Sequence, residues 1–167
     1  SEEDQARAYA RLYLVSTSVP AVERVYFFGM GDLVMNGPLW GQPYHDEIDY
    51  MEVVGRSEGD TQLRPKPAFD SLRTVVEMIS ETTYKGRIEL NSSQIWALKY
   101  QRDSEAIVAL WSLDENVTLP LQDASMIESV TSMVGDPILL SDDELQLSGR
   151  PIYVKVAAEN LASLQGE

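Results

Sequence analysis

The spacing of hydrophobic residues changes along the chain and divides it into two parts. Residues 4 to 18 carry apolar side chains three and four positions apart, the period of an amphipathic helix, and Pro20 ends it. A second helix is expected over Ala68 to Ile79, after Pro65-Lys66-Pro67, because proline suits the first turn of a helix. The first part of the chain therefore contains two helices.

A short apolar run lies between these helices. Arg24 to Phe28 ends in the turn signal Gly29-Met30-Gly31-Asp32, and its consecutive large apolar residues predict a strand buried on both faces. Such a strand needs neighbours on both edges, and no similar run lies near it in the chain. The run therefore looks like one strand taken from a larger parallel sheet.

Beyond Ser80 the pattern alternates between apolar and polar residues. Strands are expected where short apolar runs are separated by turn signals: Ile95 to Tyr100, Glu105 to Leu113, Val117 to Leu121, Ile127 to Met133, Ile138 to Leu140, Glu144 to Leu147 and Ile152 to Val156. Strands recurring about every 8 to 12 residues are typical of an antiparallel β-sandwich. The expected class is α+β, with an α/β part over residues 1–82 and a β-sandwich over 83–167.

The charge of the chain limits its partners. Its 167 residues carry 27 acidic and 13 basic side chains, and the formal net charge of −14 would repel nucleic acid and anionic membrane surfaces. No apolar run is long enough for a transmembrane helix, so a soluble chain is expected. The absence of cysteine leaves the compartment open, although Asn91 and Asn116 begin N-glycosylation patterns that would suit secretion.

The order of several short motifs resembles the last part of a (β/α)8-barrel glycoside hydrolase. The segments that carry the resemblance are Asp4 to Tyr9, Val22 to Phe28, Arg64 to Phe69, Val134 to Pro137 and Gly149 to Val154. The resemblance implies helix seven, strand eight and helix eight of a barrel, followed by the C-terminal sandwich that packs beside it. It covers nearly the whole chain.

The same resemblance implies that this chain has no catalytic pair. Such enzymes use two carboxylates, which in the barrel family stand at the ends of strands four and seven, before the position of Ser1. Glu2, Glu3 and Asp4 are expected to be solvated residues of a helix first turn. An N-terminal barrel portion of the same enzyme, or further copies of this chain in a homo-oligomer, would then be the partner.

Substrate contacts are expected near the end of the predicted strand, because barrel enzymes build their sites from the loops at that end. By resemblance, Phe28 is placed to stack on a sugar ring of an oligosaccharide or glycoside, with Trp40, Tyr44 and His45 in the loop behind it. The competing interpretation makes Phe28 a core residue and Trp40 a loop anchor. It makes His45 an exposed side chain paired with its acidic neighbours.

Other patterns give little support for cofactors. The acidic residues from Asp46 to Glu52 lack the spacing of a calcium loop, and Gly29-Met30-Gly31 lacks the third glycine and following helix of a dinucleotide site. No metal or cofactor is expected. Trp96 and Trp111 fall on neighbouring predicted strands, where they either pack in the core or form an exposed platform for sugars.

Three interpretations of function remain open. The chain is the C-terminal part of a glycoside hydrolase, a free-standing carbohydrate-binding sandwich, or an interaction protein that recruits a partner through an exposed strand. A second chain that completes a barrel favours the first, and exposed Trp96 and Trp111 favour the second. Pairing of Val25 to Phe28 with another copy of itself favours the third.

Overall fold

The structure is a computed structural model that describes residues 1–25, 54–55, 64–90, 92–114, 116–140 and 143–164. It contains two α-helices, α1 (Glu2–Thr17) and α2 (Pro67–Ile79), and the short 3-10 helices η1 (Ala124–Met126) and η2 (Ala158–Leu164). The strands are β1 (Val54–Gly55), β2 (Arg64–Pro65), β3 (Thr83–Arg87), β4 (Ile95–Arg102), β5 (Glu105–Ser112), β6 (Val117–Pro120), β7 (Ile127–Thr131), β8 (Glu144–Leu147) and β9 (Ile152–Ala157). The expected α+β class is confirmed.

Both predicted helices are present, close to their expected bounds. In α1 the Ser1 hydroxyl accepts a hydrogen bond from the Asp4 backbone N–H, which satisfies a donor that the helix itself leaves free. In α2 Pro67 occupies the first position, as the sequence predicts. The expected strand from Arg24 to Phe28 is not tested, because residues 26–28 lie outside the described part, and Arg24 and Val25 have no regular secondary structure.

The strands form one large and two small antiparallel sheets. The five-stranded sheet has the order β3-β4-β5-β9-β7, β6 pairs with β8, and β1 pairs with β2. A two-residue turn joins β4 to β5, where Asp103 has a positive φ of 50°. Aspartate tolerates this left-handed conformation better than most residues, which permits the tight connection.

The five-stranded sheet has an apolar cluster on each face. On one face, side chains such as Val108 and Val154 pack with Leu145 and Leu147 of β8. On the other face, Ile107, Trp111 and Tyr153 pack with residues of α1 and α2. The layers are therefore the helix pair, the five-stranded sheet and the β6–β8 pair. Coverage of both faces explains why β5 is buried along nearly its whole length instead of alternating.

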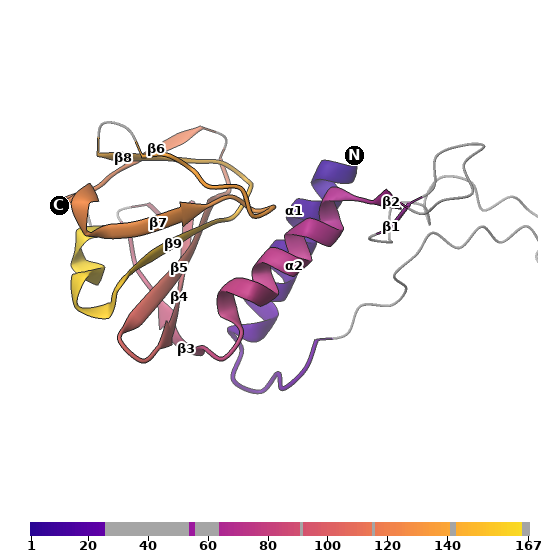
Figure 1. Cartoon of the computed structure of the whole chain (residues 1–167), viewed down its shortest axis with the longest axis horizontal. Helices are drawn as coiled ribbons and strands as arrows, with labels where there is room; N and C mark the ends of the chain where they lie inside the picture. The colour runs from indigo at the N-terminus through magenta and orange to yellow at the C-terminus, as the bar shows by residue number, and fades with distance from the viewer. Residues whose placement is uncertain (26–53, 56–63, 91, 115, 141–142, 165–167) are drawn as a thin grey trace, which may run out of the picture.

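The two helices run side by side in the same direction (Figure 1). Near their N-terminal ends, Arg64 pairs with Glu2 at 2.5 Å, and the Ser71 hydroxyl donates to the Ala6 carbonyl at 3.0 Å. At the other end, the Tyr100 hydroxyl donates to the Leu14 carbonyl of α1, and its ring contacts that of Tyr84, just after α2. Neighbouring parallel helices require the chain to return along their length between them.

Three details of the strand prediction are wrong. The short β1–β2 pair was not predicted. Ile138 to Leu140 is not a strand: Pro137 makes a single bridge to Thr131, and its missing N–H prevents a continuous ladder. β3 was not predicted, because Thr83–Arg87 lacks apolar alternation and contains Gly86, with a φ of +116°, at a bulge against β4.

Neither helix of the described part combines the length and the apolar character that a membrane span requires.

Candidate functional site

The residues predicted to contact substrate cannot be placed. Phe28, Trp40, Tyr44 and His45 all lie outside the described residues, as does the acidic segment from Asp46 to Glu52. Among the residues that the structure describes, no group of three or more acidic, histidine or cysteine side chains could hold a metal ion. The described part instead contains depressions lined by polar side chains.

Trp96 and Trp111 do not form an exposed platform. They are direct partners on β4 and β5, and their rings stack at 5.4 Å with an interplanar angle of 14°. Trp111 is 2% exposed, Trp96 packs against the same helix-facing cluster, and the Arg11 guanidinium lies 6.0 Å from the centre of the Trp111 ring. The pair belongs to the core between sheet and helices, as the alternative sequence interpretation stated.

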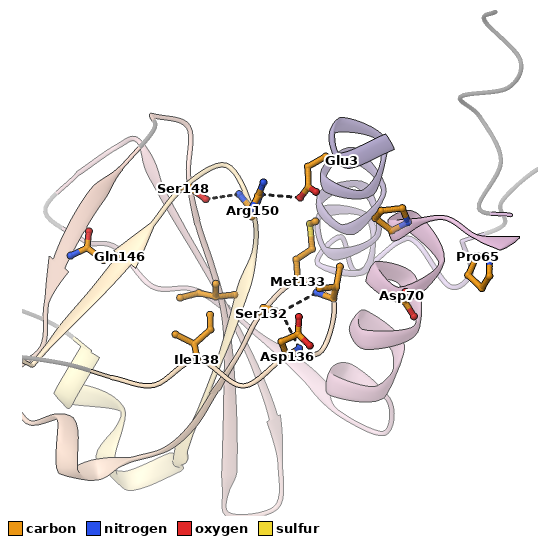
Figure 2. A pocket seen from close by; sticks show the side chains of 13 residues that line it. Glu3, Pro65, Asp70, Ser132, Met133, Asp136, Ile138, Gln146, Ser148 and Arg150 are labelled. Carbon is orange, nitrogen blue, oxygen red and sulfur yellow. Dashed lines mark hydrogen bonds and ion pairs between the residues drawn. The ribbon is translucent and has the colours of Figure 1, made fainter. Parts of the chain in front are cut away.

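A depression lies where the beginnings of the two helices meet the turns of the sheet (Figure 2). This groove has a volume of about 570 Å³. Its polar lining comes from both sides: Glu3, Asp70, Ser132, Asp136, Gln146, Ser148 and Arg150. Apolar side chains complete it: Pro65, Pro67, Met133, Val134, Ile138 and Ile152.

An ion pair stands at one border of this groove. The Arg150 Nε lies 2.9 Å from the Glu3 Oε1 (Figure 2), and the two side chains are 62% and 43% exposed. A second depression of about 440 Å³ shares Glu3, Ser148 and Arg150 with the first and extends along Asp4 and Arg7. The two depressions therefore adjoin each other at this pair, and an exposed ion pair contributes little free energy.

The arginines of α1 fix the floor beside this pair. A Cβ on Gly149 would lie 2.9 Å from the nearest nitrogens of Arg7 and Arg11, so a larger residue here would require these two flexible side chains to move. Arg11 also donates to the Ser112 carbonyl at 3.1 Å, and Arg7 pairs with Asp4 at 2.7 Å. The turn between β8 and β9 is bonded to α1 through the Glu3–Arg150 pair, and the Ser112 N–H donates to the Ser148 carbonyl at 2.8 Å.

The opposite wall is the turn that follows β7. The Ser132 hydroxyl accepts hydrogen bonds from the backbone N–H groups of Val134 and Asp136, and the Ser132 N–H donates to the Asp136 carbonyl. These bonds hold the turn in one shape and leave the exposed Asp136 carboxylate at the groove (Figure 2). Gly135, with a φ of +98°, permits the reversal.

The lining suits binding better than nucleophilic catalysis. The Ser132 and Ser148 hydroxyls accept bonds from backbone N–H groups, and the chain's single histidine, His45, lies outside the described residues. In the first turn of α1, hydrogen bonding from Arg64 lowers the pKa of Glu2, and hydrogen bonds from the N-terminal ammonium and then from the Ser1 hydroxyl lower the pKa of Asp4. Both carboxyls are therefore charged at neutral pH, as expected for residues that begin a helix.

The sequence did not reveal this groove. Glu3, Asp136 and Arg150 come from a helix start and two separate turns, and no spacing in the sequence connects them. The turn signals at Gly135-Asp136-Pro137 and Ser148-Gly149-Arg150 predicted reversals of the chain, which the structure contains. Their meeting at the helix ends follows from packing, not from local sequence.

Comparisons with known proteins add little. No protein-family model matches the chain, and no curated protein matches it. Among solved structures, the chain is similar to a GH30 endoxylanase from Clostridium papyrosolvens C71, with a TM-score of 0.37 and 17% identity. The match covers 56% of this chain and spans 28% of that one. A TM-score this low does not establish a common fold, so no activity is assigned from it.

Proposed function

We propose that the chain is the C-terminal part of a glycoside hydrolase, comprising the end of a (β/α)8 barrel and an appended antiparallel β-sandwich. The catalytic carboxylates belong to a portion outside this chain. The observation that carries the proposal is the parallel packing of α1 and α2, whose starts are joined by the Glu2–Arg64 ion pair. The hydrolase part of the proposal rests on the order of the sequence motifs that resemble the end of a barrel glycoside hydrolase.

Parallel neighbouring helices are what a repeating β/α unit produces. A strand that runs back between two helices returns the chain to the end where the first helix began. The apolar run from Arg24 to Phe28 lies between the helices in sequence and supplies such a strand. Its regular conformation requires neighbouring barrel strands on both edges.

The helix pair also has apolar side chains away from the sheet. Leu12 of α1 is 53% exposed and Val76 of α2 is 45% exposed, whereas Phe69 and Leu72 of α2 are partly buried against the cluster between helices and sheet. In a helix whose polar side faces water, these positions would be polar. Apolar residues here favour a further layer of buried strands, supplied by the barrel.

The substrate contacts of the proposal remain Phe28, Trp40, Tyr44 and His45. In a barrel enzyme the loops after the strands lead into the starts of the helices, and the active site lies on that face. Residues 18–66 form the connection that ends at the start of α2, so these four side chains belong to the appropriate loop. An aromatic ring near the strand end would stack on a sugar ring of an oligosaccharide or glycoside.

The test is to purify the protein from its source with every associated polypeptide and to determine all their sequences by mass spectrometry. The same preparation is assayed for release of reducing ends from xylan, mannan and mixed-linkage glucan. We expect a region with the preceding β/α units and two essential acidic residues, continuous with or tightly bound to this chain. A chain recovered alone, monomeric and inactive on all three polysaccharides would contradict the proposal.

A further inference from the structure

We propose that the trough on both sides of the Glu3–Arg150 ion pair binds a neutral oligosaccharide at a site separate from the loop that carries Phe28 and Trp40. This inference rests on the proposed function and adds a second binding site to it. The trough consists of the two depressions that share Glu3, Ser148 and Arg150, with volumes of about 570 and 440 Å³. Each volume lies in the usual range for small-molecule sites.

The position of the trough favours a polymeric ligand. It lies at the starts of α1 and α2, beside Pro65 and Pro67 at the end of the connection from α1. In a barrel enzyme this is the face on which the active site opens. A chain of sugar units that leaves such a site toward the β-domain would pass over this junction.

The lining matches the two surfaces of a sugar. Pro65, Pro67, Ile138 and Ile152 offer apolar surface for C–H groups. The carboxylates of Asp70 and Asp136 accept hydrogen bonds from hydroxyl groups, and hydrogen bonds to charged acceptors are stronger than neutral ones. Gln146 and Arg150 add donors.

The charge of the trough selects against acidic ligands. Its carboxylates, from Glu3, Asp4, Asp70 and Asp136, outnumber its guanidinium groups, from Arg7 and Arg150, and both arginines already pair with carboxylates. The net charge of −14 on the whole chain strengthens this repulsion. A neutral glycan fits, whereas a polyuronate or phosphorylated ligand does not.

The ion pair determines how long a ligand can be. Glu3 and Arg150 line both depressions, so their ion pair lies where the two adjoin. Both side chains are substantially exposed, so hydroxyl groups of a ligand can replace their mutual contact at little cost. A short ligand would fill one depression, and a longer one would displace the pair and occupy both.

The experiment titrates the ¹⁵N-labelled whole chain separately with xylohexaose, cellohexaose and mannohexaose. Binding is monitored by ¹H–¹⁵N correlation spectra. Hexagalacturonic acid is the charged comparison. We expect saturable shifts in the segments 132–136 and 148–150 with at least one neutral probe, and none with the acidic one. Tighter binding of the acidic probe would overturn the charge argument and the proposal.

Two variants connect the shifts to the trough. Asp136→Ala removes a lining carboxylate and is expected to raise the Kd about fivefold, the equivalent of one hydrogen bond. Glu128→Ala removes an equal charge from an exposed position on β7 outside the trough and is expected to leave the Kd unchanged. Equal effects of both variants would mean that net charge, not the trough, controls binding, and would overturn the proposal.

The outcomes separate this inference from the proposed function. Shifts confined to residues 26–53 would overturn the trough as a site while supporting the predicted substrate loop. No saturable shift with any neutral probe at about 10 mM would also overturn the trough, since even weak specific sites are half-filled near 1 mM. Neither result affects the test of the barrel by sequencing of associated polypeptides.

Discussion

Two buried tyrosines on the helix-facing side of the sheet differ in one interaction. The Tyr100 hydroxyl donates to the Leu14 carbonyl at 2.9 Å and lies 3.2 Å from the Thr17 hydroxyl, and burial raises the pKa of Tyr100 to about 12. The Tyr153 hydroxyl is buried without a hydrogen-bond partner among the described residues, and burial raises its pKa further. The Tyr100 hydroxyl is therefore expected to stabilise the fold, whereas the Tyr153 hydroxyl is expected to contribute nothing or to destabilise it.

This difference predicts opposite effects of the same substitution. Tyr100→Phe removes the hydrogen bond to Leu14 and is expected to lower the free energy of unfolding by about 1 kcal/mol. Tyr153→Phe removes a buried, unpaired hydroxyl and is expected to leave that free energy unchanged or raise it by up to about 1 kcal/mol. Urea denaturation of both variants measures this. A larger loss for Tyr153→Phe would show that its hydroxyl has a partner, such as a buried water.

Prediction of single residues from sequence succeeded where local chemistry decides and failed where packing decides. The proline pair before α2 located its start because proline at the first helical position costs no hydrogen bond. The direct stacking of Trp96 on Trp111 depends on the register of β4 against β5, which the two-residue turn between them sets and which alternation alone does not specify. The groove residues Glu3, Asp136 and Arg150 depend on packing between distant elements.

At the scale of elements, one carboxylate connects three strands. Glu105, at the start of β5, pairs with Arg102 of β4 at 2.9 Å and with Lys155 of β9. Hydrogen bonding from Lys155, followed by that from Arg102, lowers the pKa of Glu105 below its ordinary value of 4.5. A carboxyl whose pKa is lower in the folded state stabilises the fold above its unfolded pKa and loses this contribution as the pH falls.

Glu105→Gln is therefore expected to destabilise the chain at pH 7 by about 1 kcal/mol. The difference from the wild type should shrink as the pH falls below about 4.5, where the wild-type carboxyl becomes protonated. This is checked by measuring the thermal unfolding midpoints of both proteins between about pH 3 and pH 7, in steps of about one pH unit. Glu128→Gln, on the exposed side of β7, serves as the control, and an equally pH-dependent effect there would contradict the assignment.

Two adjacent valines of α2 test which side of this helix is buried. Val75 is fully buried against the sheet, whereas Val76 is 45% exposed on the proposed barrel side. Val75→Ala is expected to cost about 2 kcal/mol of unfolding free energy, and Val76→Ala to change it by less than about 0.5 kcal/mol. The two variants gain the same helix propensity, so denaturant midpoints compare burial alone. Equal costs would mean that Val76 is already covered in the isolated chain.

At the scale of the whole molecule, exposed apolar residues on the helix pair predict association. We expect the isolated chain to form dimers or larger species in sedimentation experiments, because Leu12 and Val76 expose apolar surface. Leu12→Lys combined with Val76→Lys should shift the chain to monomers. The control carries the same charge change on exposed strand positions, Thr118→Lys with Ser129→Lys. A wild-type chain that is a stable, monodisperse monomer would count against a missing layer on the helices.

The division of the chain into helical and strand-rich parts could be predicted, because the two periods of hydrophobic residues differ strongly. The number of sheets and their order could not, since the pairing of β5 with β9 joins segments separated by three other strands. The missed β3 shows the same limit: a short edge strand with a bulge is specified by its partner β4, not by alternation of its own residues.

The common direction of α1 and α2 also has a consequence for protein engineering. A chain that leaves the end of one helix and enters the start of the other must cross a distance of about 24 Å, which roughly eight extended residues can span. The stretch from 18 to 66 is several times longer than this. A short flexible linker that keeps Arg64 to Lys66, and with them the Glu2–Arg64 ion pair, is therefore expected to preserve the packing of the two helices, which would yield a minimal domain for crystallisation.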